Sequence, residues 1–318
     1  MKISLLEPIG VPAEKIQSLS RALTDQGHDF TYYDTKTTDV EELKRRSIGQ
    51  DVVMIANNPY PDEVVLAADS LKMIAVAFTG IDHVGLNACR EKGIEVRNCA
   101  GYSNETVAEL VIGLTLELMR KIRLSDETVR SGGTNAGLAG CEIAGKKVGI
   151  VGCGKIGTRT AELFQAFGAD VCAYDPAPAP ALAEKGIRLE ALDTLLAQSD
   201  IVSIHMPLTP STRGFMDAEK IDRMKETALL INCARGPIVD NEALAKALNE
   251  GKIAGAGIDV FDMEPPIPED YCLLHAKNTI LTPHIAFLSK ESMVRRAEIE
   301  FDNVASYVNG VAKNVCKY

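Results

Sequence analysis

The sequence predicts an α/β protein built from two doubly wound parallel sheets of the Rossmann or flavodoxin type. Short β-branched runs alternate with segments of helical period, and this alternation stops and then restarts near Lys147. A G-x-G-x-x-G motif follows the first strand of the second half. Strands that alternate with helices indicate βαβ units, whose strands are parallel. A length of 318 residues allows two domains, each large enough to bury its own core.

The first half of the chain supplies the strands of one predicted sheet. Segments of helical period, including residues 14–26, 40–48 and 64–68, separate these strands. The predicted strands are residues 2–6, 30–33, 52–56, 73–77 and 94–97. Together they place one complete sheet within about the first 100 residues.

The second half repeats the same rhythm from Lys147 onward. The predicted strands are residues 148–151, 170–174, 201–205, 228–232, 257–260 and 279–281. A long apolar-periodic helix over residues 104–120 and a glycine-rich loop over 131–140 lead into this half. A last helical stretch, residues 290–309, has no strand to accompany it.

Composition and charge exclude several classes of protein. The chain is 46% apolar and 25% charged, which is ordinary for a globular protein and unlike a disordered or membrane protein. Asp and Glu outnumber Lys and Arg by 44 to 34, so phosphate backbones and anionic lipids would repel the chain. We therefore expect no nucleic-acid partner and no membrane partner.

The cysteines and the N-terminus indicate a cytoplasmic protein. Eight cysteines are scattered without a C-x-x-C pair or a histidine at zinc-ligand spacing, so we expect free thiols and no metal site. The apolar run after Met1 is too short for a signal peptide.

The glycine motif predicts a dinucleotide site. Gly152, Gly154 and Gly157 leave an apolar strand and open a helix. The first glycine permits the tight turn, the second lets the backbone approach a pyrophosphate, and the third allows the helix to pack closely on the sheet. The N-terminus of that helix adds free N–H groups and a positive dipole. Asp175 can bind both ribose hydroxyls and would repel a 2′-phosphate, so we expect NAD rather than NADP.

A nicotinamide site also needs a cation for an anionic substrate and a proton donor for its carbonyl. Arg235 follows a predicted buried strand, where ligands of such sheets bind, and its guanidinium can hold a carboxylate and polarise a carbonyl. His205 and His284 both end predicted strands, and spacing does not choose between them as the proton donor. Glu264 is a candidate for keeping a neighbouring imidazole protonated.

Several blocks together resemble the D-isomer-specific 2-hydroxyacid dehydrogenases, essentially from end to end and in family order. These blocks are residues 152–157, 205–210, 232–236, 257–261 and 281–286. The resemblance implies that residues 1–100 and 289–318 form a substrate-binding domain. It also implies that residues 101–288 form an NAD-binding Rossmann domain and that the active site lies in the cleft between the two domains.

The resemblance further implies roles for individual residues. Arg235 binds the substrate and polarises its carbonyl, His284 is the general acid/base, and Glu264 is the carboxylate partner of His284. His205 matches a position beside the adenosine half of the cofactor, and Asp259 matches the aspartate that binds the nicotinamide carboxamide. The other positions that match NAD contacts are Lys155, Ile156, Pro207, Thr212, Cys233, Ala234 and Ala286.

The implied substrate-binding residues lie mainly in two loops of the first half. Backbone N–H groups of residues 79–81 are expected to hold the substrate carboxylate. The loop from Asn57 to Tyr60 is expected to meet the substrate side chain, because its amides and phenol suit hydroxyl or carbonyl groups. The full implied set is Asn57, Phe78, Thr79, Gly80, Ile81 and Arg235.

The expected substrate is a small, unphosphorylated 2-oxo acid, with hydroxypyruvate or glyoxylate favoured. No Lys or Arg occurs between Arg46 and Lys72, whereas relatives that take phosphorylated substrates generally have basic residues in that loop. The alternatives are a D-3-phosphoglycerate or D-lactate type of dehydrogenase, or an NAD-binding interaction protein of the corepressor type. Family members usually dimerise through the NAD domain, so we expect a homodimer. Phe287 stands where many relatives have Gly.

Overall fold

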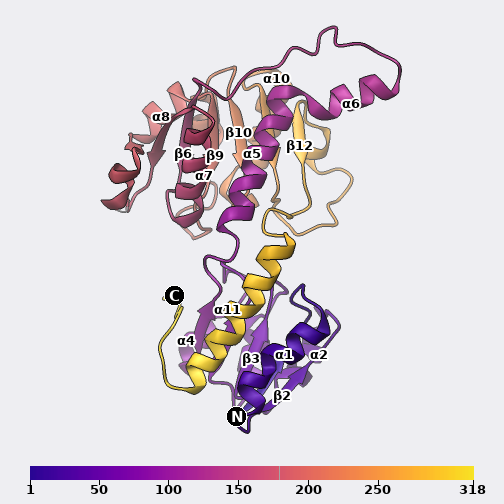
Figure 1. The fold of residues 1–318 in the computed structure, drawn as a ribbon, viewed down its shortest axis with the longest axis vertical. Helices are drawn as coiled ribbons and strands as arrows, with labels where there is room; N and C mark the ends of the chain where they lie inside the picture. Colours follow the sequence, from indigo (N-terminus) through magenta and orange to yellow (C-terminus); the bar gives the residue numbers. More distant parts are fainter. Residues whose placement is uncertain (179) are drawn as a thin grey trace. The chain divides into compact units, whose positions relative to one another are not determined.

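The structure is a computed structural model that describes residues 1–178 and 180–318. The chain divides into two compact units. Unit 1 comprises Met1–Ser103 and Leu288–Tyr318, and unit 2 comprises Asn104–Phe287. Each unit contains one parallel sheet, which confirms the predicted α/β class with two doubly wound sheets (Figure 1).

Unit 1 contains a five-stranded sheet in the order β2-β1-β3-β4-β5, which is the flavodoxin-like order. Its strands are β1 (Lys2–Leu5), β2 (Asp29–Tyr32), β3 (Val52–Ile55), β4 (Met73–Val76) and β5 (Glu95–Asn98). Every residue of β3 and β4 is buried. Helices cover both faces of a parallel sheet, and central strands of this kind therefore read as continuous apolar runs.

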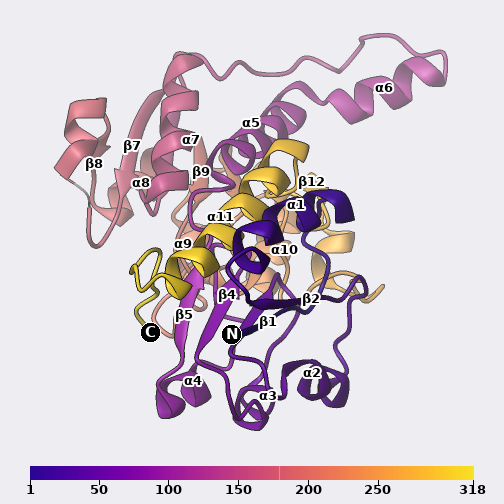
Figure 2. The same ribbon diagram turned by 60° about the horizontal axis from the view of Figure 1, so that its bottom comes forward.

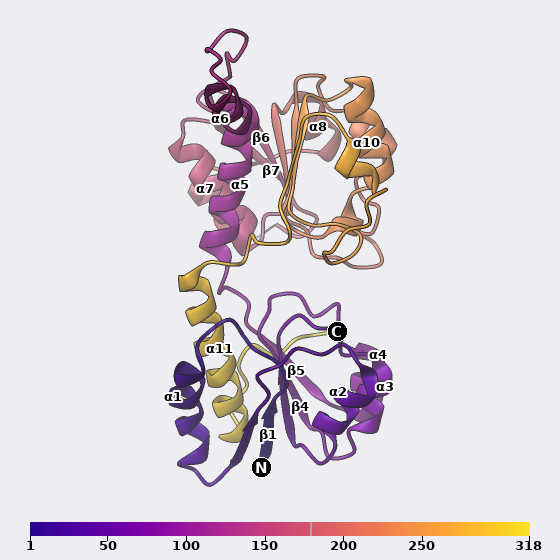
Figure 3. The ribbon, with the colours of Figure 1, turned by 90° about the vertical axis from the view of Figure 1, so that its right-hand side faces the viewer.

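Helices cover the unit 1 sheet on both faces (Figures 2 and 3). They are α1 (Ala13–Thr24) and α11 (Lys290–Val308) on one face, and α2 (Val40–Ser47), α3 (Asp62–Ala67) and α4 (Leu86–Lys92) on the other. The last helix, α11, packs against α1, β4 and β5. Beyond it, the Cys316 N–H donates to the Val96 carbonyl oxygen at 2.8 Å, so the C-terminal segment lies along β5.

Unit 2 contains a seven-stranded sheet in the order β12-β11-β10-β9-β6-β7-β8. Its strands are β6 (Lys147–Val151), β7 (Asp170–Tyr174), β8 (Arg188–Leu189), β9 (Ile201–Ile204), β10 (Leu229–Asn232), β11 (Gly255–Ile258) and β12 (Thr279–Leu281). From β6 to β11 the strands follow the Rossmann order, and β12 extends one edge. The prediction missed β8, whose two exposed residues form no apolar run.

In unit 2, α5 and α7 lie on one face of the sheet, and α8 and α10 lie on the other (Figure 3). The helices are α5 (Asn104–Arg120), α6 (Ile122–Arg130), α7 (Lys155–Ala166), α8 (Leu192–Gln198), α9 (Ala218–Asp222) and α10 (Asn241–Glu250), with 3₁₀ segments at Pro180–Lys185, Gly236–Ile238 and Cys272–His275. The prediction missed α6. This helix has nine residues, follows a left-handed residue, Lys121, and has no buried residue.

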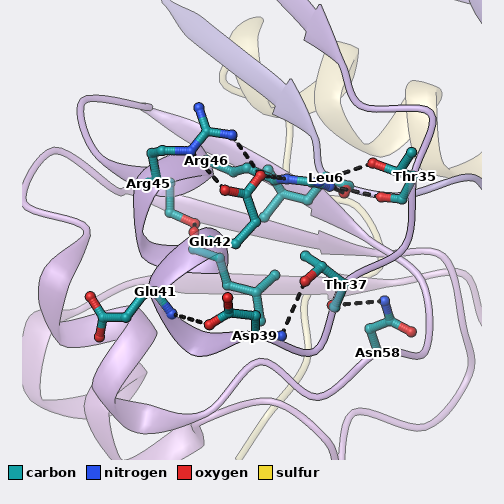
Figure 4. A network of polar contacts seen from close by, with 11 residues as sticks. Leu6, Thr35, Thr37, Asp39, Glu41, Glu42, Arg45, Arg46 and Asn58 are labelled. Atoms are coloured by element: carbon teal, nitrogen blue, oxygen red, sulfur yellow. Dashed lines mark hydrogen bonds and ion pairs between the residues drawn. The ribbon is translucent and has the colours of Figure 1, made fainter.

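A buried arginine joins the loops at the carboxyl edge of the unit 1 sheet (Figure 4). Arg46 Nη1 donates to the carbonyl oxygens of Leu6 at 2.7 Å and Thr35 at 2.8 Å, which follow β1 and β2. Asn58, which follows β3, donates from Nδ2 to the Thr37 carbonyl oxygen at 3.2 Å. The loops after three neighbouring strands are therefore tied to one another.

Two further expectations concern the chain as a whole. All eight cysteines are free, as predicted. Among the described residues, no helix has the length and apolar character needed to cross a bilayer.

Candidate active site

The predicted catalytic residues and NAD-binding residues of unit 2 lie just beyond the carboxyl ends of its strands. The glycine motif follows β6, Asp175 follows β7, and His205 follows β9. Arg235, Glu264 and His284 follow β10, β11 and β12. The sheet order therefore separates a dinucleotide half from a half that carries a cation, a carboxylate and an imidazole. Successive strands are added on one side of β6 up to β8 and on its other side from β9 onward, and ligands of open parallel sheets bind where the strand order reverses in this way.

The three glycines of the motif have different surroundings. A Cβ added at Gly157 would lie 2.1 Å from the Gly152 carbonyl oxygen, so this position admits only glycine. Gly152 has φ +92°, and a Cβ there would lie 2.8 Å from the His205 backbone. A Cβ at Gly154 would meet no atom within 4 Å. The open space at Gly154, next to the N-terminus of α7, fits the close approach of a pyrophosphate to the backbone.

The Asp175 carboxylate connects the end of β7 to the glycine motif. Its Oδ2 accepts a hydrogen bond from the Cys153 N–H at 2.7 Å, and its Oδ1 accepts one from the Ala177 N–H at 2.8 Å. A carboxylate can accept about four hydrogen bonds, so these two leave capacity for ribose hydroxyls. The arrangement suits the adenosine end of NAD.

The two histidines that the sequence could not separate have different environments. His205 Nε2 lies 2.8 Å from Ser203 Oγ. Burial lowers the pKa of His205 to about 3, so this imidazole is neutral at physiological pH. A ring that stays neutral cannot donate the proton that carbonyl reduction requires. This environment favours His284 as the proton donor.

His284 is held from several directions within unit 2. Its Nδ1 lies 2.9 Å from both carboxylate oxygens of Glu264. The imidazole packs edge-to-face with the Phe287 ring, with centroids 5.4 Å apart. Its backbone has φ +56°, and its N–H donates to the Asp259 carbonyl oxygen at 2.8 Å. Because Nδ1 faces Glu264, proton exchange with a substrate has to use Nε2.

The buried Asp259 carboxylate organises the turn that carries His284. Its Oδ1 accepts hydrogen bonds from Thr282 Oγ1 at 2.6 Å and the Ile285 N–H at 2.8 Å, and its Oδ2 accepts one from the Ala286 N–H at 2.9 Å. Burial raises the pKa of Asp259, whereas these three donors lower it. The sequence suggested only a contact with the nicotinamide carboxamide. It held no signal for this positioning role, because the donors come from another strand end.

The Asn232 side chain holds the loop that carries Arg235. Its fully buried side chain accepts a hydrogen bond from the Ala234 N–H and donates to the Arg235 carbonyl oxygen, both at 3.0 Å. A Cβ at Gly236 would lie 1.9 Å from the Phe261 carbonyl oxygen. The loop after β10 therefore lies directly against the loop that leads to Glu264.

The other predicted NAD residues occupy the same edge of the unit 2 sheet. Lys155 and Ile156 form the first turn of α7. Thr212 Oγ1 donates to the Pro207 carbonyl oxygen at 2.6 Å and closes the loop after β9. The remaining three, Cys233, Ala234 and Ala286, lie after β10 and β12. Burial raises the pKa of the Cys233 thiol well above its usual range, which disfavours the reactive thiolate form.

The predicted substrate loops lie at the carboxyl edge of the unit 1 sheet. Thr79, Gly80 and Ile81 follow β4, and the described residues offer no hydrogen-bond acceptor to their backbone N–H groups. Phe78 is buried. Tyr60 is 1% exposed and its hydroxyl donates to Ser47 Oγ at 2.8 Å. The expectation that the Tyr60 phenol meets a substrate was wrong, because this side chain belongs to the core.

Sequence reasoning also missed a cation beside Asn57. Lys36 Nζ lies 3.4 Å from Asn57 Oδ1 and 3.9 Å from Glu7 Oε2. The absence of Lys and Arg between Arg46 and Lys72 therefore does not leave this loop without a positive charge. Lys36 comes from the loop after β2, and only the order of the strands brings it there.

Among the residues that the structure describes, no three His, Cys, Asp or Glu side chains are grouped so as to hold a metal ion.

A model of the family described as D-isomer specific 2-hydroxyacid dehydrogenase, NAD binding domain, matches residues 112–286. The chain belongs to this family. Among relatives of the dehydrogenase, hydroxypyruvate reductase of Blautia hydrogenotrophica is 37% identical over 93% of this chain and 94% of that protein. Glycerate dehydrogenase of Methylorubrum extorquens is 38% identical over 91% and 92%.

A solved structure leads to the same family. The dehydrogenase matches the crystal structure of D-lactate dehydrogenase from Aquifex aeolicus, complexed with NAD and lactic acid, with a TM-score of 0.84. The two chains are 30% identical, and the match covers 98% of this chain and 96% of that one. The predicted enzyme class, an NAD-dependent D-2-hydroxyacid dehydrogenase, and the predicted cofactor are confirmed.

The glycine geometry yields a paired test of the NAD site. Gly154→Ala should leave the thermal midpoint within about 2 °C of wild type but weaken NADH binding at least tenfold, because its methyl group enters open space that we expect the pyrophosphate to occupy. Gly157→Ala should lower both the midpoint and the affinity, because its methyl group meets backbone. Thermal denaturation and calorimetric titration with NADH provide the two measurements. Unchanged NADH affinity in Gly154→Ala would contradict this assignment.

Proposed function

We propose that the dehydrogenase reduces small, unphosphorylated 2-oxo acids to D-2-hydroxy acids, with hydroxypyruvate or glyoxylate favoured. The observation that carries the proposal is the placement of Arg235, Glu264 and His284 on three neighbouring strand ends, with His284 Nδ1 2.9 Å from the Glu264 carboxylate. Relatives named hydroxypyruvate reductase and glycerate dehydrogenase, which match more than nine-tenths of the chain, support the choice of substrate.

Three side chains of unit 2 have separate roles in the proposed reaction. Bound NADH supplies the hydride that reduces the C2 carbonyl. The Arg235 guanidinium holds the substrate and stabilises the negative charge that develops on the carbonyl oxygen. His284 donates a proton from Nε2 to that oxygen, and the Glu264 carboxylate stabilises the imidazolium and orients the ring. In the oxidative direction, His284 removes the hydroxyl proton.

The substrate carboxylate is assigned to the loop after β4. Backbone N–H groups at Thr79, Gly80 and Ile81, which have no acceptor among the described residues, suit an anion because they bind it without adding bulk. Asn57 is assigned to the rest of the substrate, and Phe78 stays a candidate through the 5% of its surface that is exposed. Unit 1 is on this view the substrate-binding unit, and unit 2 is the NAD-binding unit.

On the cofactor side, the glycine motif and α7 are assigned to the pyrophosphate and Asp175 to the adenosine ribose. The Asp175 carboxylate would repel a 2′-phosphate, which supports NADH as the working reductant. The free cysteines are typical of a reducing compartment, which supports a cytoplasmic location.

We also propose that the dehydrogenase is a homodimer in which α6 contacts a second copy. A nine-residue helix is too short to be stable alone in water, and none of the residues of α6 is buried. Ile122 and Val129 lie on one side of this helix and are 52% and 71% exposed. Figure 1 shows α6 projecting from the rest of unit 2. A second copy of the chain would bury this apolar side.

The proposed roles of Arg235 and His284 are tested by turnover. Arg235→Ala and His284→Ala should each reduce kcat for hydroxypyruvate by roughly 10²–10⁴-fold, because a charged binding group or a proton donor is lost. NADH affinity should stay within about threefold of wild type. His275→Ala removes an exposed imidazole of the same unit and should leave kcat unchanged. The substrate assignment is tested with the wild-type enzyme by the kcat/KM values for hydroxypyruvate, glyoxylate, pyruvate and phosphohydroxypyruvate. NADH oxidation is followed at 340 nm. Exclusive turnover of phosphohydroxypyruvate would overturn the substrate assignment.

The role of Glu264 is tested by steady-state turnover. Glu264→Gln keeps the size of the side chain but removes the negative charge 2.9 Å from His284 Nδ1. The kcat for hydroxypyruvate should fall by roughly tenfold or more, because the carboxylate orients the ring and stabilises its charged form during proton transfer. Glu269→Gln changes an exposed acid nearby and serves as the control. An unchanged kcat in Glu264→Gln removes this residue from the mechanism.

The proposed dimer is tested by sedimentation velocity. Val129→Asp places a charge on the apolar side of α6 and should convert the dimer to monomers, with no loss of the folded state by circular dichroism. Val311→Asp changes a comparably exposed valine in unit 1 and should leave the dimer intact. A wild-type chain that sediments as a monomer would rule the dimer out.

A further inference from the structure

The carboxyl edge of the unit 1 sheet holds a buried carboxylate that the proposed chemistry does not use. Glu7 lies two residues after the end of β1, and its side chain is 3% exposed. Its Oε1 accepts hydrogen bonds from the Ala56 N–H at 2.8 Å and the Asn58 N–H at 3.3 Å. Burial raises the pKa of Glu7, whereas the Ala56 and Asn58 N–H groups and the charges of Lys36 and Arg296 lower it. Two N–H donors require an acceptor, and they therefore favour the ionised carboxylate.

The second oxygen of this carboxylate faces a lysine. Glu7 Oε2 lies 3.9 Å from Lys36 Nζ and accepts no hydrogen bond from the described residues. The Lys36 side chain is 54% exposed, and its Nζ also lies 3.4 Å from Asn57 Oδ1. The ammonium group is therefore open to a ligand on one side and balanced by a buried negative charge on the other.

The loops that carry this pair are fixed in place. Arg46 fastens Leu6, the residue before Glu7, and Thr35, the residue before Lys36 (Figure 4). Asn58 is hydrogen-bonded to the Thr37 carbonyl oxygen, on the other side of Lys36. The lysine backbone is thus held between two anchored neighbours, so the Lys36 side chain starts from a fixed point next to Glu7.

The pair lies beside the loop that is assigned to the substrate carboxylate. The loops at Asn57 and at Thr79 follow the neighbouring strands β3 and β4, and paired strands lie about 4.8 Å apart. A three-carbon 2-oxo acid whose carboxylate binds at residues 79–81 has its C3 substituent within reach of the next loop. Lys36 and Asn57 are the polar groups that such a substituent would meet there.

We infer that Lys36 and Glu7 form a charge-compensated pair that selects the substrate by the charge on its C3 substituent. This inference rests on the proposed function. An uncharged hydroxyl group accepts a hydrogen bond from Lys36 without disturbing the pair. A phosphate group gains little from a lysine whose charge is already balanced, and it is repelled by the carboxylate behind that lysine. Lys36 and Glu7 thus favour hydroxypyruvate over its phosphate.

The inference is tested by the ratio of kcat/KM for phosphohydroxypyruvate to kcat/KM for hydroxypyruvate, measured with NADH at low ionic strength. Glu7→Gln keeps an acceptor for the Ala56 N–H but removes the charge, so the ratio should rise at least tenfold, mainly through KM. Lys36→Met should raise the KM for hydroxypyruvate several-fold with little change in kcat. In the double variant Glu7→Gln/Lys36→Met, the tenfold rise of the kcat/KM ratio should disappear. A merely structural role for Glu7 would lower both kcat/KM values together.

A matched pair of charges at the opposite edge of the same sheet provides the control. Lys72 Nζ lies 2.7 Å from Asp51 Oδ1, in the segments that precede β4 and β3. Asp51→Asn and Lys72→Met make the same changes of charge and should leave the ratio within about twofold of wild type.

Two outcomes overturn the inference while hydroxypyruvate turnover is intact. One is an unchanged ratio in a folded Glu7→Gln variant. The other is an unchanged KM for hydroxypyruvate in Lys36→Met, whose half-exposed position tolerates substitution even where Glu7→Gln fails to fold. Failure of the proposed function looks different, because the wild-type enzyme would then turn over none of the unphosphorylated 2-oxo acids.

Discussion

Parallel pairing gathers the carboxyl ends of all strands of a sheet at one edge, and the functional residues of this dehydrogenase depend on that constraint. Arg235, Glu264 and His284 are far apart in the sequence, yet they follow three adjacent strands. In unit 1, the same constraint brings the loops near Lys36 and Asn57 together. The order of the strands therefore decides which side chains can cooperate.

The order of the strands does not by itself fix the conformation of a loop. Buried polar side chains hold the loops through hydrogen bonds. Three buried polar side chains bind the loops that follow strands, mainly through hydrogen bonds to backbone groups. They belong to Asp259, Asn232 and Arg46. Buried N–H and C=O groups without partners are costly, so each of these side chains stabilises one loop conformation over its alternatives. The His284 turn shows the result, because a non-glycine residue with φ +56° needs such support.

Features that repeat along the sequence or have a fixed spacing could be predicted from it. Apolar runs predicted every strand except the exposed β8, and the glycine motif and Asp175 marked the dinucleotide half. The choice of His284 over His205 needed either the family resemblance or the burial of His205, because both histidines end strands. Asp259 as a support for the His284 turn and Lys36 as a neighbour of Asn57 were not predictable from spacing. Their partners come from other strand ends, and a single sequence does not record which strands are neighbours.

The position of α11 has a consequence for synthesis of the chain. This helix packs against α1, β4 and β5 and shares one face of the unit 1 sheet with α1, so that face is only partly covered until residues 290–308 have been made. Unit 2 is continuous in sequence from Asn104 to Phe287 and is complete earlier. On the ribosome, unit 2 can therefore reach its folded state first, while one face of the N-terminal sheet is still partly uncovered. The N-terminal part of the chain is the last to finish folding, and until then that face is open to chaperones and to aggregation.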